Sequence, residues 1–264
     1  MHFIIFGQIA FSASILMFVG WIVSVVRKRA EIVDVLWTLG TAFAGIWCAL
    51  ELDGDLNRRI ILALMFGIWG FRLSAHLYKD RVLAKFEDGR YKDLRAEWAG
   101  AANAKFFLFF QLQAFLIPVL ATTAFSVATN LRSLEWYDSI AILIMSVAIF
   151  GEMLSDRQLS QFKNTQKNNL APNNSICRVG LWNWSRHPNY FFEWLFWISF
   201  PVLAYGSPYF LFSLISPILM FYLIRYVTGI PPTENRMLQS RGDIFKKYQA
   251  EVSAFIPLPP RVKN

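Results

Sequence analysis

A polar cluster interrupts the apolar sequence between Gly180 and Trp197. It supplies a cation, an imidazole, an amide, a phenol and a carboxylate: Arg186, His187, Asn189, Tyr190 and Glu193. Pro188 suits the first turn of a helix, and such a helix would place Asn189 and Glu193 on one face, because they are four residues apart. An acid inside a membrane helix is costly and by default indicates a functional site.

Four further polar sets border other apolar runs. They are Asp34; Trp69, Arg72 and His76 at helical spacing; Glu152 and Asp156 at i and i+4, followed by Lys163; and Arg225, Glu234 and Arg236 around the break at 229–232. Carboxylates in or against apolar segments are not needed by a chain that only sits in a membrane. These sets are therefore candidates for a binding site.

The elements that must position these residues are apolar runs of about 20 residues, the length that crosses a bilayer core. The 264-residue chain is 55% hydrophobic and 17% aromatic. We predict an all-α membrane bundle of seven transmembrane helices that forms a single domain over residues 1–264. The predicted spans are 3–26, 32–50, 60–78, 106–128, 138–154, 190–205 and 208–227. The first is too long for a signal-peptide core, so we expect a retained span.

The positive charges are unevenly distributed between the loops. All but three of the 26 Lys and Arg residues lie in or beside the loops after spans 1, 3 and 5 and in the tail; the exceptions are Arg58, Arg59 and Arg132. The positive-inside rule then predicts an outer N-terminus and a cytoplasmic C-terminus, in a bacterial inner membrane. The five polar sets converge on the cytoplasmic face, where we expect a pocket. Topology and contact with lipid headgroups account for most single charges, so we predict no nucleic-acid partner.

The motifs exclude several kinds of site. The two cysteines and three histidines are scattered singly, so we predict neither metal nor disulfide. No Ser-His-Asp arrangement, phosphate-binding Gly loop or dinucleotide Gly fingerprint is present. Cations beside amide, phenol and indole groups suit a nucleotide-containing cofactor. The apolar interior of the bundle suits a lipophilic second substrate.

The run from Gly180 to Trp194 closely resembles the signature of the steroid 5-alpha-reductase-like membrane proteins, in their uncharacterised DUF1295 branch. The resemblance covers nearly the whole chain and is carried also by residues 33–37, 69–73, 87–91, 151–159 and 248–257. Isoprenylcysteine carboxyl methyltransferases and sterol reductases have related segments. Phe192 stands where the branch usually has Gly, and Trp184 replaces a common Tyr.

The resemblance implies a cofactor site drawn mostly from residues 138–264. The positions that match cofactor contacts of the steroid reductases are Asp156, Lys163, Asn189 and Glu193. The same loop is extended by Arg186, His187 and Tyr190, and the site is closed by Arg225 and Glu234. The predicted set is completed by Arg72, Glu152 and Arg236. In those reductases a span 2 acid and span 3 aromatic groups polarise the substrate carbonyl, which implies catalytic roles for Asp34, Trp69 and His76.

These observations support three hypotheses. The first is an NADPH-dependent reductase of a conjugated C=C bond in a lipophilic enone, in which Asp34 or protonated His76 hydrogen-bonds the carbonyl oxygen as charge develops there. The second is an S-adenosylmethionine-dependent methyltransferase of the isoprenylcysteine type, whose cofactor needs no cation for a 2′-phosphate. The third is a lipid-binding bundle without turnover. The lipophilic substrate and the oligomeric state stay open.

Overall fold

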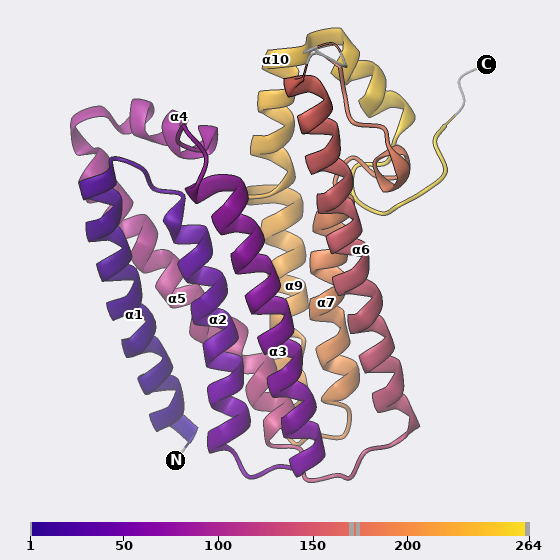
Figure 1. Ribbon diagram of the computed structural model, residues 1–264. Coiled ribbons are helices and arrows are strands. Elements are labelled where there is room, and N and C mark those ends of the chain that lie inside the picture. The colour runs from indigo at the N-terminus through magenta and orange to yellow at the C-terminus, as the bar shows by residue number, and fades with distance from the viewer. Residues whose placement is uncertain (1, 169–171, 173–174, 262–264) are drawn as a thin grey trace. The chain divides into compact units, whose positions relative to one another are not determined.

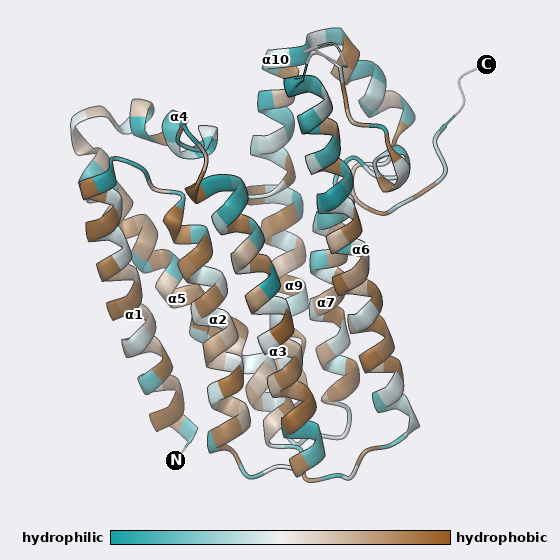
Figure 2. Ribbon diagram, viewed as in Figure 1, coloured by the Kyte–Doolittle hydropathy of each residue, from teal (hydrophilic) through white to brown (hydrophobic). Residues whose placement is uncertain are grey.

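The computed structural model describes residues 2–168, 172 and 175–261, and every regular element in these ranges is a helix. The predicted all-α class is therefore confirmed. Six stretches are long and apolar enough to cross a membrane: His2–Arg27, Ile32–Glu51, Leu56–Val82, Gly89–Ala128, Trp136–Lys167 and Phe210–Glu251. Hydrophobic residues dominate their middles (Figure 2). The remaining predicted span coincides with a helix of only 16 residues, Pro188–Leu203. Six of the seven spans are thus supported, and the sidedness of the termini stays a prediction.

The chain forms two compact units, which we describe separately. Unit 1 comprises residues 1–135 and 203–216, and unit 2 comprises residues 136–202 and 217–264. The prediction of a single membrane domain over 1–264 stays a prediction.

Unit 1 is built around helix α2 (Figure 1). Its helices are α1 (His2–Arg27), α2 (Ile32–Glu51), α3 (Leu56–Leu77), α4 (Gly89–Trp98), α5 (Ala102–Ala128) and the short α8 (Phe210–Ser213), with irregular turns η1 (Tyr78–Val82) and η2 (Ala99–Ala101). Helix α2 packs against α1, α3 and α5. The approach to α3 needs small residues, because a Cβ on Gly45 would lie 2.3 Å from the ring of Phe66. Such close packing fixes α2 at the centre of the unit.

The end of unit 1 that holds the start of α3 closes around Arg58. This side chain is fully buried. Its guanidinium donates to the carbonyls of Leu203 (2.5 Å), Ser133 (3.2 Å) and Arg132 (3.4 Å). Asp55 caps the helix by accepting from the backbone N–H of Arg58 at 3.0 Å. The sequence marked Arg58 only as one of three exceptions to the distribution of positive charge, whereas the structure makes it a buried link between three segments.

Unit 2 contains the longest helix and the C-terminal tail (Figure 1). Its elements are α6 (Trp136–Lys167), η3 (Gly180–Asn183), α7 (Pro188–Leu203), α9 (Ile215–Tyr222), η4 (Leu223–Val227) and α10 (Ile230–Glu251). Pro188 begins α7, where its missing N–H has no helical partner to lose. The predicted break at 229–232 is confirmed, since Gly229 precedes α10 and prolines occupy its first turn. Gly242 interrupts α10 with a φ of 50°.

Candidate functional site

The loop before α7 is held in place from three directions. Its anchoring hydrogen bonds run from Trp182 Nε1 to the Ser155 carbonyl (2.9 Å), from the Tyr248 hydroxyl to the Trp182 carbonyl (2.5 Å), from Ser185 Oγ to the Phe255 carbonyl (2.8 Å) and from the Arg186 N–H to the Ser253 carbonyl (2.8 Å). The partners come from α6, α10 and the tail. The backbone of the predicted motif therefore has a defined position before any ligand binds.

Glu234 on α10 gathers the polar side chains of this loop. It accepts from Arg186 Nε (2.7 Å) and Nη2 (3.2 Å), from His187 Nε2 (3.0 Å) and from Gln249 Nε2 (2.7 Å). Arg186 Nη1 also donates to the carbonyls of Gln249 (3.1 Å) and Val252 (2.5 Å), near the end of α10. Four of the five N–H groups of Arg186 are thereby used. These contacts favour a positioning role for Arg186 and Glu234 over direct contact with a cofactor phosphate.

His187 is buried between Glu234 and the first turn of α7. Its ring stacks on Tyr190 with centroids 5.4 Å apart and an interplanar angle of 7°. Burial lowers the pKa of His187 below its ordinary value, and this outweighs the hydrogen bond to Glu234, which raises that pKa. The imidazole is therefore neutral at neutral pH. With Nε2–H donating to Glu234, its Nδ1 atom is left as an acceptor.

Helices α6 and α7 bring buried carboxylates and an amide to one region of unit 2. Glu152, Asp156 and Glu193 are all buried. Asn189 Nδ2 lies 3.4 Å from Asp156 Oδ1, and Trp197 Nε1 donates to Glu193 Oε1 at 2.9 Å. The expected helical pairs, Glu152 with Asp156 and Asn189 with Glu193, both lie within continuous helix. This acid–amide face is the part of the predicted cofactor site that unit 2 assembles most directly.

Phe192 owes its place to a glycine on the facing helix. A Cβ on Gly151 of α6 would lie 2.4 Å from the Phe192 ring. The Phe192 ring on α7 therefore packs against a bare backbone on α6. Since Gly151 precedes Glu152 and Phe192 precedes Glu193, this contact sets the spacing of the acid–amide face.

We predict that Gly151→Leu lowers the free energy of unfolding by about 1–3 kcal/mol, because overpacking forces helices or side chains to shift. Thermal unfolding in detergent measures it. The double variant Gly151→Leu/Phe192→Gly should recover most of the loss, since removing the ring vacates the space that the leucine needs. Equal destabilisation in the single and double variants would contradict this packing.

Three cations of the predicted cofactor site also lie in unit 2. Arg225 is half-buried over the ring of Tyr226, 5.3 Å from its centroid, and makes no ion pair with any residue described in the structure. Its charge contributes to the lowered pKa of His187, so it lies close to the loop. Lys163 is exposed on α6, and Arg236 is half-buried on α10. Among these predicted cofactor-binding cations, Arg225 has the clearest capacity to bind an anion.

In unit 1 the predicted acid, Asp34, is the centre of an ion-pair network. It accepts from the Tyr91 hydroxyl at 2.6 Å, from Arg90 Nη2 at 2.9 Å and from Arg81. Two guanidinium partners stabilise the ionised carboxylate, which has no proton to donate. Asp88 caps α4 beside the same arginines. Burial raises the pKa of Asp88, but Arg90 and Arg81 lower it by more, so the pKa lies below its ordinary value. Asp34 is thus placed as an acceptor, which weakens its predicted role as hydrogen-bond donor.

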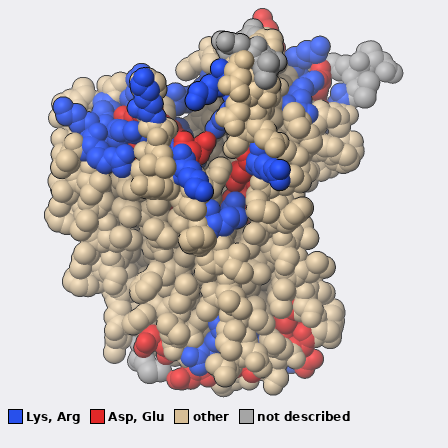
Figure 3. Space-filling model, viewed as in Figure 1, with Lys and Arg blue, Asp and Glu red and all other residues tan. Residues whose placement is uncertain are grey.

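The other predicted catalytic residues lie along α3. Trp69 is fully buried and makes edge contacts with Trp37 (6.4 Å) and Phe66 (6.2 Å), as expected of a packing residue. Arg72 and His76 are half-buried one turn apart. Lys and Arg side chains gather over the end of unit 1 that carries α4 (Figure 3). Sequence reasoning assigned no role to Tyr91, although it noted the segment 87–91 that contains it.

Comparison with known proteins identifies the family. A family model described as a protein of unknown function, DUF1295, matches residues 20–252. The chain belongs to the DUF1295 family. An uncharacterized protein of Schizosaccharomyces pombe is 25% identical over 262 residues, which cover 90% of this chain and 75% of that protein. No solved structure matches.

This DUF1295 protein thus carries two polar clusters in otherwise apolar units. The cluster of unit 2 offers carboxylate, amide and cationic groups, which together can bind hydroxyls, amides and an anion. The cluster of unit 1 offers a tyrosine hydroxyl held by a carboxylate, with His76 on the neighbouring helix α3. The predicted DUF1295 membership is confirmed, and the chemistry follows from these groups alone.

Proposed function

We propose that this DUF1295 protein is a membrane-embedded, NADPH-dependent reductase of a conjugated C=C bond in a lipophilic enone. The observation that carries the proposal is the acid–amide face of unit 2, where Asn189 lies against Asp156 and Glu193 is buried one turn further along α7. Charged groups in a membrane bundle are expensive and persist where they bind something. The resemblance to the steroid reductases supports a nicotinamide cofactor as that partner.

The polar side chains of unit 2 fit such a cofactor. Glu152, Asp156 and Lys163 follow one another at i, i+4 and i+11, so they share one face of α6 over about 16 Å. The face changes from carboxylates, which accept from ribose hydroxyls and a carboxamide, to a cation that suits phosphate. Arg225 adds a second cation. When bound, NADPH supplies the hydride that adds to the β carbon of the enone.

The proposed reaction also needs a hydrogen-bond donor to the enone oxygen. Because Asp34 already accepts from Tyr91 and two arginines, the proposal assigns this donor role to protonated His76. A cationic donor stabilises the negative charge that develops on the oxygen as the enolate forms. The ion-pair network then has a positioning role, since it links η1 and α4 to the start of α2.

One observation favours the second candidate, an S-adenosylmethionine-dependent methyltransferase. Arg186 already donates to Glu234 and to carbonyls at the end of α10. Carboxylates therefore dominate the polar groups that stay available to a ligand. Carboxylates suit the ammonium group and ribose hydroxyls of S-adenosylmethionine, which carries no phosphate. The two candidates therefore differ in their need for the cations Lys163 and Arg225.

Ligand-induced thermal stabilisation of the purified full-length protein in detergent separates the candidates. At about 100 times its dissociation constant, NADPH should stabilise the fold by about 2.7 kcal/mol. Glu193→Gln and Arg225→Gln should reduce this shift, while Lys246→Gln, which removes an exposed cation paired with Asp243, should not. A shift with S-adenosylmethionine alone would replace the reductase by the methyltransferase. No shift with either cofactor would favour the lipid-binding bundle.

A further inference from the structure

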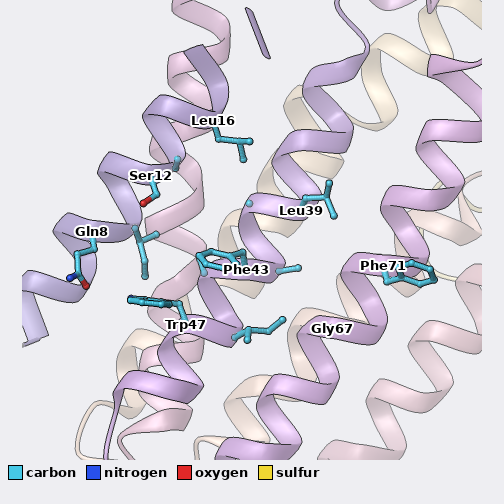
Figure 4. A pocket seen from close by; sticks show the side chains of 14 residues that line it. Gln8, Ser12, Leu16, Leu39, Phe43, Trp47, Gly67 and Phe71 are labelled. Atoms are coloured by element: carbon cyan, nitrogen blue, oxygen red, sulfur yellow. The ribbon is translucent and has the colours of Figure 1, made fainter. Parts of the chain in front are cut away.

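A groove of about 800 Å³ lies over the outer face of α2 in unit 1, between α1 and α3 (Figure 4). None of the residues that line it is charged. Phe43 and Trp47 project from α2 toward α1, with their rings stacked at 5.9 Å and 21°. Because the three helices are membrane-spanning candidates, the surroundings of this groove are lipid hydrocarbon.

The groove is polar at one end and apolar at the other. Gln8 on α1 lies toward the end that Trp47 borders, and Ser12 lies one turn further along α1, toward the middle of the groove (Figure 4). Leu16 and Leu39 lie toward the other end, about two helical turns or 12 Å away. The polar end is near the first turns of α1 and the last turns of α2. A lipid in a leaflet is oriented in the same way as this groove: its oxygen atoms lie near the membrane surface and its hydrocarbon chain lies toward the membrane centre.

Trp47 presents a hydrogen-bond donor with no partner at the polar end. Its Nε1 atom is buried and makes no hydrogen bond to any described residue. A buried donor left unsatisfied is costly, and indole groups usually find a partner when buried. The amide of Gln8 lines the same end, and the hydroxyl of Ser12 lies one turn further along α1; each group can donate and accept. Uncharged groups of this kind suit neutral oxygen atoms and leave an ionised group without a counter-charge.

We propose that this groove binds a neutral lipid that carries a hydroxyl or carbonyl group, with its oxygen at Trp47 and its hydrocarbon chain along Phe43 and Leu39. The site is separate from the acid–amide face and does not depend on the reductase proposal. Membrane phospholipids share the hydrocarbon chain but carry charged headgroups, so the two sources differ in how much they gain from the polar end.

Photo-crosslinking of the full-length protein in lipid vesicles tests the proposal. The probes are a long-chain alcohol with a diazirine in its chain and a phosphatidylcholine whose acyl chain carries the same diazirine. Labelled peptides are then located by mass spectrometry. We expect the alcohol to label the stretches 39–47 and 67–71 more than the phosphatidylcholine does. Equal labelling of these stretches by both probes would overturn the preference for a neutral oxygen.

Two glycine variants show whether the groove itself is occupied. A Cβ on Gly67 would meet only Ile46, at 4.0 Å, and a Cβ on Gly7 of α1 would meet nothing within 4 Å. Gly67→Leu should therefore fill the groove without strain and reduce labelling by about tenfold, since a filled volume admits no ligand. Gly7→Leu adds the same side chain outside the groove and should leave labelling unchanged. A response shared by both variants would overturn the proposed site.

A third variant tests the donor. Trp47→Phe keeps an aromatic ring and removes the indole N–H. The loss of one hydrogen bond should weaken alcohol labelling by about two- to tenfold and leave phosphatidylcholine labelling unchanged. Unchanged alcohol labelling in Trp47→Phe would overturn the assignment of Trp47 as the oxygen-binding group.

Discussion

Replacing Arg58 with Met should lower the free energy of unfolding by about 3–5 kcal/mol. Met keeps much of the side-chain length but donates no hydrogen bond. The buried carbonyl of Leu203 and the part-buried carbonyls of Ser133 and Arg132 would then lose their partner. A buried carbonyl left unsatisfied costs about 1–3 kcal/mol and each part-buried hydrogen bond about 0.5–1.5 kcal/mol, so the combined loss is large compared with an ordinary substitution. Thermal unfolding of the purified variant in detergent measures it.

Two variants distinguish this hydrogen-bonding role from a purely electrostatic role. Arg132→Met removes an exposed side chain at the same end of unit 1 and should change stability by no more than about 0.5 kcal/mol. Arg58→Lys keeps the positive charge but lacks the planar fork that reaches three acceptors. If Arg58 acted only as a charge, Arg58→Lys would match the unmodified protein. We expect it to lose more than half as much stability as Arg58→Met.

Arg58 also shows where sequence reasoning reaches its limit. Hydropathy predicts the helices well, because a span must be apolar whatever it packs against. Helix α2 covers Ile32–Glu51 against a predicted 32–50. The partners of a polar side chain are set by tertiary packing, and no periodicity reports them. From the sequence, Arg58 is only one of three scattered charges. Its hydrogen-bond acceptors lie on segments far along the chain, so the sequence around Arg58 does not reveal them.

Helix ends differ from the predicted spans for a related reason. Helix α6 continues to Lys167, whereas the apolar run ends near residue 154. The polar stretch after Glu152 keeps good helix formers, so the helix extends beyond the apolar span. Helix α7, in contrast, ends at Leu203 and is too short to meet the length of a typical span. Hydropathy marks the apolar part of a helix and not the helix itself.

The candidate site was predicted at the level of helix faces. The spacing of Glu152 with Asp156 and of Asn189 with Glu193 places each pair on one face, and the hydrogen bond between Asn189 and Asp156 joins the two faces. The long-range pairs were beyond reach: Tyr91 with Asp34 and Arg186 with Glu234 are separated by tens of residues. These pairs decide which charges are available to a ligand and which are already committed.

The commitment of Arg186 leads to a second large effect. Glu234→Gln should lower the free energy of unfolding by about 3–5 kcal/mol, because it leaves a buried guanidinium without its counter-charge. The side chains of Arg186 and Glu234 are only 10% and 12% exposed. The substitution keeps the shape of the side chain, so the loss reports the charge and not a cavity. Thermal unfolding without added nucleotide measures it.

Three comparisons test whether the expected loss of stability in Glu234→Gln comes from the unpaired charge of Arg186. Glu251→Gln removes the carboxylate of the more exposed Arg178–Glu251 pair and should cost about 1 kcal/mol or less. The double variant Arg186→Met/Glu234→Leu should recover much of the loss, since apolar groups often replace a buried ion pair without penalty. If Glu234 instead contacted a cofactor directly, Glu234→Gln would leave nucleotide-free stability nearly unchanged and abolish only the ligand-induced shift. We expect Glu234→Gln to lose stability without a ligand because the ion pair fixes the loop before α7 in the ligand-free protein.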